Sequence, residues 1–206
     1  MTLNQNSSMI SLAETIADHK FVLGDRLVEI GISGPDLEAT LSSIAMAQAE
    51  LGHARLIYRW VADLKGENGS KQEIKQQTGK AFQSLVEINN WITLIAGLYT
   101  TNVAIDLVMK ALLKGDHKHL NLPFSKMLKE QHEHVNYSKS WSEQLLNERG
   151  SIPLRFEKQL EKASFEVEQW LNKVEKDNTI LANSNLTEQF NETIKSLYKD
   201  GVVTNV

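Results

Sequence analysis

Two short runs of this sequence place a carboxylate and an imidazole one helical turn apart. The first pair is Glu50 with His53, and the second is Glu130 with His134. Residues three or four positions apart project from the same face of an α-helix, so each pair could converge on one point. A glutamate followed three residues later by a histidine, presented from two facing helices, is how four-helix bundles hold a pair of metal ions.

The second copy of this pattern is imperfect. The residue three positions before His134 is Gln131, an amide where the metal-binding pattern has a carboxylate. If four long helices form an antiparallel bundle, the polar residues expected to point inward are Asp25, Glu50, His53, Asn102, Asp106, Glu130, Gln131 and His134. Carboxylate and imidazole donors suit iron or manganese, so this set is the candidate metal site.

A metal-free interpretation uses the same residues. Glu50 paired with His134, and Glu130 paired with His53, would be buried ion pairs that set the register of the helices without any metal. The spacing leaves both interpretations open.

Composition narrows the class of protein. The chain has 206 residues, no cysteine and a formal net charge of −4, with no basic block. We therefore expect one domain over residues 1–206, no thiolate metal site, and neither nucleic acid nor membrane as a partner. The polar N-terminus, and the absence of any window long enough to span a bilayer, lead us to expect a cytoplasmic protein.

Helix signals dominate the rest of the chain, and no alternating strand pattern competes with them. Prolines 35, 123 and 153 stand at expected helix starts, and Ser11 with Glu14 has capping-box spacing. The predicted fold class is all-α, with a core bundle at about 11–147 and C-terminal helices at about 154–200. The expected helices are about Ser11–Ile30, Pro35–Lys65, Lys71 or Lys80 to Lys114, Pro123–Asn147, Leu154–Lys176 and a short one from Thr187 to Gly201. The first carries an acidic stripe, Asp18, Asp25 and Glu29 with Val22, which we expect to be solvated.

Two segments carry a family resemblance. Leu23–Leu56, which contains RL…G-P-x-LE, and Lys129–Trp141, which reads KEQHEHVNYSKSW, resemble the phenylacetic acid catabolic protein family. The resemblance implies a ferritin-like four-helix bundle with two additional C-terminal helices. It also implies a place in a multicomponent phenylacetyl-CoA epoxidase, in which a catalytic di-iron subunit oxygenates an aromatic CoA thioester with electrons from a separate reductase.

The resemblance is nearest to the structural, non-catalytic subunit, PaaC, which pairs with the catalytic one. We therefore expect a hetero- or homo-oligomer. Glu50 and His53 match the catalytic pattern, whereas Gln131 and the lack of a glutamate near Asn102 depart from it. By position, Asp25 would stand for the family's first-helix glutamate, and Asp106 lies one turn from the third. The alternatives are a catalytic di-iron oxygenase subunit and a ferritin-like iron-binding protein. The expected metal ligands are thus Glu50, His53, Glu130, His134, Asp25 and Asp106, binding iron or manganese unless the chain is metal-free.

Overall fold

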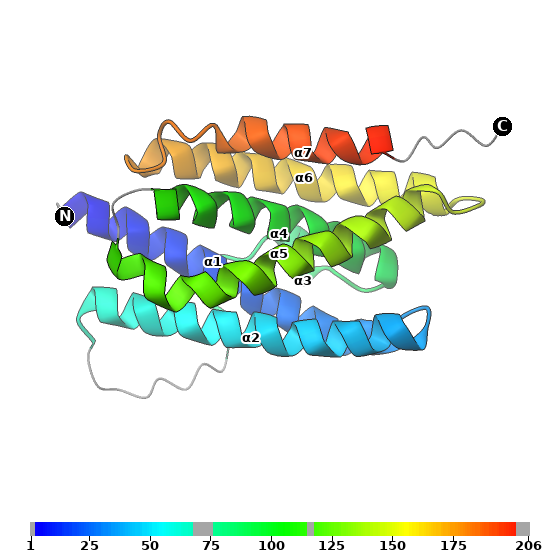
Figure 1. The fold of residues 1–206 in the computed structure, drawn as a ribbon, viewed down its shortest axis with the longest axis horizontal. Helices are drawn as coiled ribbons and strands as arrows, with labels where there is room; N and C mark the ends of the chain where they lie inside the picture. Colours follow the sequence, from blue (N-terminus) through cyan, green and yellow to red (C-terminus); the bar gives the residue numbers. More distant parts are fainter. Residues whose placement is uncertain (1–2, 68–75, 115–117, 201–206) are drawn as a thin grey trace. The chain divides into compact units, whose positions relative to one another are not determined.

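The computed structural model describes residues 3–67, 76–114 and 118–200, and every regular element in these ranges is helical (Figure 1). The elements are α1 (Leu3–Glu29), the 3₁₀ turn η1 (Gly31–Ser33), α2 (Leu37–Lys65), α3 (Gln83–Val86), α4 (Trp91–Lys114), α5 (Lys118–Leu146), α6 (Ile152–Asp177) and α7 (Leu186–Asp200). This confirms the predicted all-α class and is consistent with a ferritin-like helical bundle.

The chain forms two compact units. The first unit comprises residues 1–91 with 177–179, and the second comprises residues 92–176 with 180–206. The boundary between them falls at the start of α4. Each unit is described below by itself, and the expectation of one domain over residues 1–206 stays a prediction.

The first unit contains a hairpin of two long helices, α1 and α2, with η1 in the turn between them, and α3 contacts α1. Asp36 begins α2 by accepting a hydrogen bond from the Ala39 backbone N–H at 2.7 Å, which satisfies one of the donors exposed at a helix start. Gly24 lets the helices approach closely, because a Cβ there would lie 2.6 Å from Leu51 Cγ. The hairpin is therefore closely packed beside the run that contains Glu50 and His53.

The second unit is built on α4, a helix that is apolar around most of its circumference. Sixteen of its 24 residues are buried, including Tyr99, Asn102 and Asp106. The α6 and α7 helices lie side by side (Figure 1), and α7 also contacts α5. A helix that is apolar on all sides belongs in a protein core or in a membrane.

The expectation that no segment could span a bilayer needs correction at α4. This helix is the one helix among the described residues that is long and apolar enough to cross a membrane, with a mean hydropathy of 1.6 over its best window. However, 83% of that window is buried inside the structure. Since the core helix of a soluble protein passes the same test, α4 is only weak evidence for a membrane.

Several predicted helix boundaries are wrong, and packing explains the first. The first helix begins at Leu3 rather than Ser11. Met9, which precedes the predicted start, is buried, so the core-facing stripe continues from Leu12 by one turn towards the N-terminus. The predicted third helix is interrupted at residues 87–90, between α3 and α4. Asn89 and Asn90 lie in this break, and asparagine side chains compete with the helical backbone for hydrogen bonds.

The fourth predicted helix also starts early. It begins at Lys118, so Pro123 lies inside α5 rather than at its start, and residues 118–122, which were expected to lie between two helices, are helical. The last two helices match their predicted ranges to within two residues. Gly201 and part of the loop after α2 lie outside the described residues, as does the alternative helix start at Lys71.

Candidate functional site

The centre of the first unit holds a buried ion pair. Lys20 Nζ on α1 lies 2.7 Å from Glu50 Oε2 on α2, and both side chains are completely buried. A fully buried lysine is rare unless it is paired. The structure thus places an ammonium group against the carboxylate that the sequence makes the leading metal-ligand candidate.

The register of α1 brings Lys20 to this position. Ala13, Ile16, Leu23 and Leu27 are buried at three- and four-residue intervals, and Lys20 falls in the same stripe. The sequence interpretation missed Lys20, although a lone cation in an apolar stripe is a recognisable signal. Such a residue needs a buried carboxylate as its partner.

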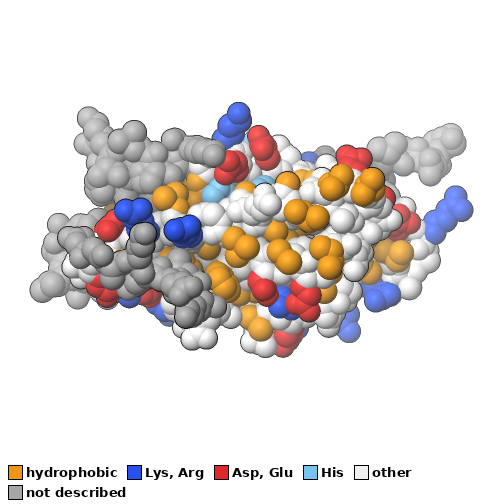
Figure 2. Space-filling view, turned by 90° about the horizontal axis from the view of Figure 1, so that it is seen from below, with side chains coloured by type: hydrophobic (Ala, Val, Ile, Leu, Met, Phe, Trp, Pro, Cys, Tyr) orange, Lys and Arg blue, Asp and Glu red, His pale blue; other side chains and the backbone are white. Residues whose placement is uncertain are grey.

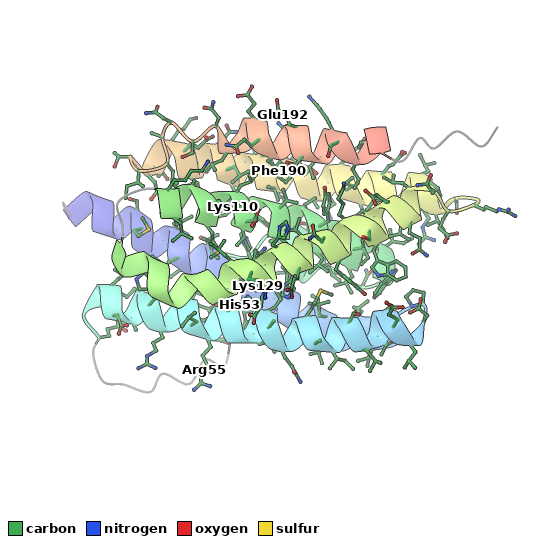
Figure 3. The ribbon with its side chains drawn as sticks, in the orientation of Figure 1. His53, Arg55, Lys110, Lys129, Phe190 and Glu192 are labelled. Atoms are coloured by element: carbon green, nitrogen blue, oxygen red, sulfur yellow. The ribbon has the colours of Figure 1, made fainter. Side chains whose placement is uncertain are left out.

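His53 lies one turn after Glu50 on the buried side of α2, and its side chain is also buried. Figure 3 shows Arg55 pointing outward on the other side of this helix. The expectation that Glu50 and His53 share a covered face of one helix is therefore confirmed. Their metal binding stays a prediction.

Asp25 does not point inward as expected. Its side chain is 55% exposed, and its carboxylate forms an ion pair with Arg26 at 2.6 Å. Asp25 is five residues after Lys20, and five residues correspond to about 500° of helix rotation, which turns it well away from the buried stripe. On α1, the position facing Glu50 is therefore held by Lys20 and not by Asp25.

An amide pair occupies the corresponding place in the second unit. Gln131 Nε2 on α5 donates to Asn102 Oδ1 on α4 at 2.6 Å and to the Asn102 carbonyl oxygen at 2.9 Å. Both residues are completely buried, and His134 is buried one turn further along α5. The polar interruptions in α4 and α5 are thus paired with each other.

The other two predicted ligands lie beside this pair. Asp106 is buried one turn after Asn102, and its Oδ2 forms an ion pair with Lys110 at 2.6 Å. Its Oδ1 has no hydrogen-bond partner in the described part of the chain. Glu130 is half-buried on α5, where it flanks Gln131. That these two carboxylates bind metal stays a prediction.

A second buried carboxylate lies on α1, two residues before Lys20. Asp18, expected on a solvated stripe, is completely buried, and its neighbour on that stripe, Val22, is also largely buried. The Asp18 carboxylate accepts hydrogen bonds from the Thr78 and Lys80 backbone N–H groups at 2.9 and 2.7 Å, from the Thr78 hydroxyl and from the Tyr58 hydroxyl. Burial, reinforced by the bond to Asp18, raises the pKa of Tyr58. The expectation that the acidic stripe is solvated is therefore confirmed for Asp25 and Glu29, which are exposed, and wrong for Asp18.

His19 lies next to this cluster and is completely buried. Its ring contacts the Phe82 ring, with centroids 3.8 Å apart. Burial lowers the pKa of His19 to about 3, and the Lys20 charge adds to the effect. His19 is therefore neutral at physiological pH and packs as an aromatic core residue.

These contacts do not fit a di-metal centre. Such a centre in a four-helix bundle takes one glutamate from each of two helices and a Glu-x-x-His pair from each of the other two. Here α2 supplies Glu50-x-x-His53, but the position facing Glu50 is an ammonium, and the second pair begins with a neutral amide that faces another neutral amide. Among the described residues, no three His, Asp or Glu side chains are gathered in a geometry that could hold a metal ion.

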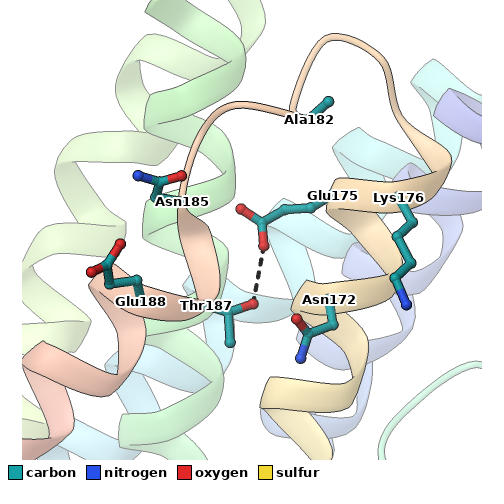
Figure 4. Close-up of a pocket in the computed structure, with 7 residues that line it drawn as sticks. All are labelled: Asn172, Glu175, Lys176, Ala182, Asn185, Thr187 and Glu188. Atoms are coloured by element: carbon teal, nitrogen blue, oxygen red, sulfur yellow. Dashed lines mark hydrogen bonds between the residues drawn. The ribbon is translucent and has the colours of Figure 1, made fainter.

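A polar hollow of about 390 Å³ between α6 and α7 has a structural explanation (Figure 4). Glu175 crosses it and accepts hydrogen bonds from the Leu186 backbone N–H at 2.6 Å and from the Thr187 hydroxyl at 3.1 Å. These contacts satisfy donors at the start of α7. The carboxylate therefore stabilises a helix start and is not available for a ligand.

Comparison with known proteins gives one strong result. A family model described as "Phenylacetic acid catabolic protein" matches residues 1–204, nearly the whole chain. No curated protein matches the chain significantly.

Proposed function

Because this chain belongs to the phenylacetic acid catabolic protein family, we propose that it is the structural, PaaC-like subunit of a multicomponent phenylacetyl-CoA epoxidase. In this role it is cytoplasmic, binds no metal, and pairs with a homologous catalytic di-iron subunit that receives electrons from a reductase. The family places the chain in phenylacetate catabolism, and the choice of subunit rests on the chain's own residues.

The ion pair between Lys20 and Glu50 carries this proposal. A buried carboxylate can bind a dipositive metal only if its charge is not already compensated, and here a protein ammonium lies 2.7 Å from it. Displacing that ammonium would leave a second buried charge without its partner. The Lys20 ammonium therefore occupies the place at Glu50 where a catalytic relative needs to bind a metal ion.

The amide pair in the second unit supports the same conclusion. Asn102 and Gln131 are neutral, and Gln131 donates its amide hydrogens to Asn102. Neutral amide oxygens cannot balance the charge of oxidised iron as carboxylates do. Glu50 matches the pattern of four carboxylates that a di-iron bundle needs, whereas Glu130 lies one residue before Gln131 and Asp106 lies one turn after Asn102.

Metal analysis tests the proposal directly. We expect the full chain, produced with iron and manganese supplied and then desalted, to retain far less than one metal ion per chain by elemental analysis. The comparison is a triple variant, Lys20→Glu, Asn102→Glu and Gln131→Glu, which has the four carboxylates and is expected to retain more metal. Two metal ions per wild-type chain would contradict the structural assignment.

The intact Glu50-x-x-His53 pair favours one alternative, a catalytic subunit. That assignment requires stoichiometric metal and reductase-dependent oxygenation of phenylacetyl-CoA by this chain without a relative. For a ferritin-like iron-binding protein, ferroxidase activity in the absence of any partner is the corresponding test. We expect neither activity from the isolated chain, and we expect oxygenation only when a catalytic member of the family is added.

A further inference from the structure

The starting observation is a glycine that the chain's own packing does not explain. Gly52 lies in the middle of α2, is exposed, and has no atom within 4 Å of the place where a Cβ would stand. Glycine is the least favourable residue for a helix interior after proline. Its use at an open position is explained if the backbone of another chain approaches there.

Gly52 belongs to a continuous exposed face of α2. The members of this face, called here the α2 stripe, recur at alternating three- and four-residue intervals: Glu38, Leu41, Ala45, Gln48, Gly52, Arg55 and Arg59. This interval keeps the residues on one face of the helix, along which a second helix can pack. Figure 3 shows Arg55 projecting outward on this side of α2.

Apolar side chains are exposed at the N-terminal half of the stripe. Leu41 is 59% exposed, and its neighbours Leu37 and Ile44 are 73% and 39% exposed. Figure 2, seen from the side on which α2 lies in Figure 1, shows hydrophobic side chains gathered on the surface there. Contiguous exposed apolar groups of this kind mark interaction sites.

The stripe is self-complementary about Gln48. Glu38 and Arg59 lie ten and eleven residues from it, on opposite sides, and Ala45 and Gly52 lie three and four residues from it. If two such helices run antiparallel and cross at Gln48, the acidic end of one meets the basic end of the other. The two smallest side chains then meet each other, which allows close approach.

We propose that the α2 stripe pairs with the α2 stripe of a second copy of this chain, in an antiparallel, two-fold symmetric contact. Glu38 of each copy faces Arg59 of the other, Ala45 faces Gly52, and Leu41 packs against the stem of Arg55. Over residues 38–59 the contact extends for about 33 Å of helix. A two-fold interface must use the same patch on both copies, as this charge distribution does.

Charge complementarity is the reason for choosing a second copy over an unrelated partner. An unrelated protein would supply its own charges, and nothing would require the acid and the base to lie almost equally far from one central residue. The proposal goes beyond the function proposed above, since it does not depend on which subunit of the enzyme this chain is.

Charge reversal tests the pairing on the full-length chain. We expect sedimentation velocity at about 1 to 100 µM protein to show a dimer for wild type. Glu38→Arg and Arg59→Glu should each raise the dimer dissociation constant roughly tenfold or more, because each places like charges opposite each other twice per dimer. Mixing the two variants should restore a dimer, since every Arg at position 38 or 59 then faces a Glu.

Two controls match these changes. Glu188→Arg alters an acidic residue in the first turn of α7, as Glu38→Arg does in α2, and Arg155→Glu reverses an exposed arginine on α6. Both controls should leave the dimer intact. Gly52→Leu has room in the isolated chain and should favour the helix, yet it should weaken the dimer at least tenfold.

A monomeric wild type over this range would overturn the proposal. So would single variants that remain as dimeric as wild type, or a mixture of the two variants that stays monomeric. None of these measurements involves metal or oxygenase activity. A monomeric chain would therefore not contradict the proposed function, and metal found in the wild type would not contradict the dimer.

Discussion

At the scale of single residues, Lys20 makes it possible to bury the Glu50 carboxylate at the centre of the first unit. Burying a charged group costs several kcal/mol, and its attraction to an opposite charge repays this only when the contact is close. The 2.7 Å contact with Glu50 meets that condition, and both groups are fully buried. Each charge therefore requires the other, and removing one should cost more than removing both.

Lys20→Met tests that dependence. We expect it to lower the free energy of unfolding by about 3–5 kcal/mol, because it leaves the Glu50 carboxylate buried without its cation. Adding Glu50→Gln should recover at least about 2 kcal/mol, since the uncompensated charge is then gone. Urea unfolding of the two single variants and the double variant measures this coupling. Additive effects would mean that the two groups stabilise the hairpin independently.

His19 gives the first unit a dependence on pH. Its pKa is about 3 in the folded chain, against 6.5 for an ordinary histidine, so the unfolded chain takes up a proton more readily between these values. Unfolding is therefore favoured as the pH falls. We expect the free energy of unfolding to drop by up to about 1.4 kcal/mol per pH unit from this residue alone, between about pH 6.5 and pH 3.

The measurement is urea unfolding at pH 7, 6 and 5, with His19→Gln for comparison. Glutamine does not titrate, so the variant should lose less stability on acidification even if it is less stable at pH 7. Acidic groups such as Glu14, whose pKa is lowered by Lys65 and Lys80 against the opposing effect of burial, contribute equally to both proteins. Parallel pH profiles would show that His19 is not the group responsible.

At the scale of elements, Asp18 fixes the chain that enters α3. Its carboxylate binds the backbone N–H groups of Thr78 and Lys80, which belong to a segment without regular structure. The Tyr58 hydroxyl binds the same carboxylate from α2. One buried side chain on α1 thus connects both helices of the hairpin to residues sixty positions away in the sequence.

Asp18→Asn should loosen that segment selectively. The amide presents an NH₂ group to donors that need an acceptor, so we expect a loss of about 3 kcal/mol and faster hydrogen exchange at the Thr78 and Lys80 amides. Tyr58→Phe removes one donor and leaves the carboxylate with three, so its effect should be clearly smaller. Equal protection of these amides in Asp18→Asn and wild type would contradict the role given to Asp18.

Helix identity was largely predictable from the sequence, whereas helix boundaries were predictable only for some of the helices. The apolar periodicity of α2, α6 and α7 located these helices, because each has a defined buried face. The break before Trp91 was missed because the apolar stripe continues through Leu85 and Ile88 into α4, and both residues are buried despite the break. Periodicity reports which residues are buried, but it does not report whether the backbone between them is helical.

The candidate site was predictable in part, for a related reason. Spacing along one helix identified Glu50 and His53 as neighbours, and this pairing needs no knowledge of other elements. The residue facing Glu50 depends on the register between α1 and α2, which is set by contacts such as that of Gly24 with Leu51. Asp25 was chosen by position, as the counterpart of the family's first-helix glutamate, whereas the apolar residues around Lys20 indicated the buried position.

At the scale of the whole molecule, pairing of two chains through the α2 stripe would link stability to concentration. A dimer that unfolds to separate chains becomes more stable as the protein concentration rises, by about 1.4 kcal/mol for each tenfold increase. Because two chains of 206 residues unfold together, this corresponds to a rise of roughly 1.5–3 °C in the unfolding midpoint. Gly52→Leu should remove this dependence while keeping the midpoint of the dilute protein at or above that of wild type, because leucine favours the helix where no atom of the same chain interferes. Thermal unfolding at about 2, 20 and 200 µM protein measures both effects. A midpoint of wild type that does not change over this range would mean that the stripe is covered by something other than a second copy.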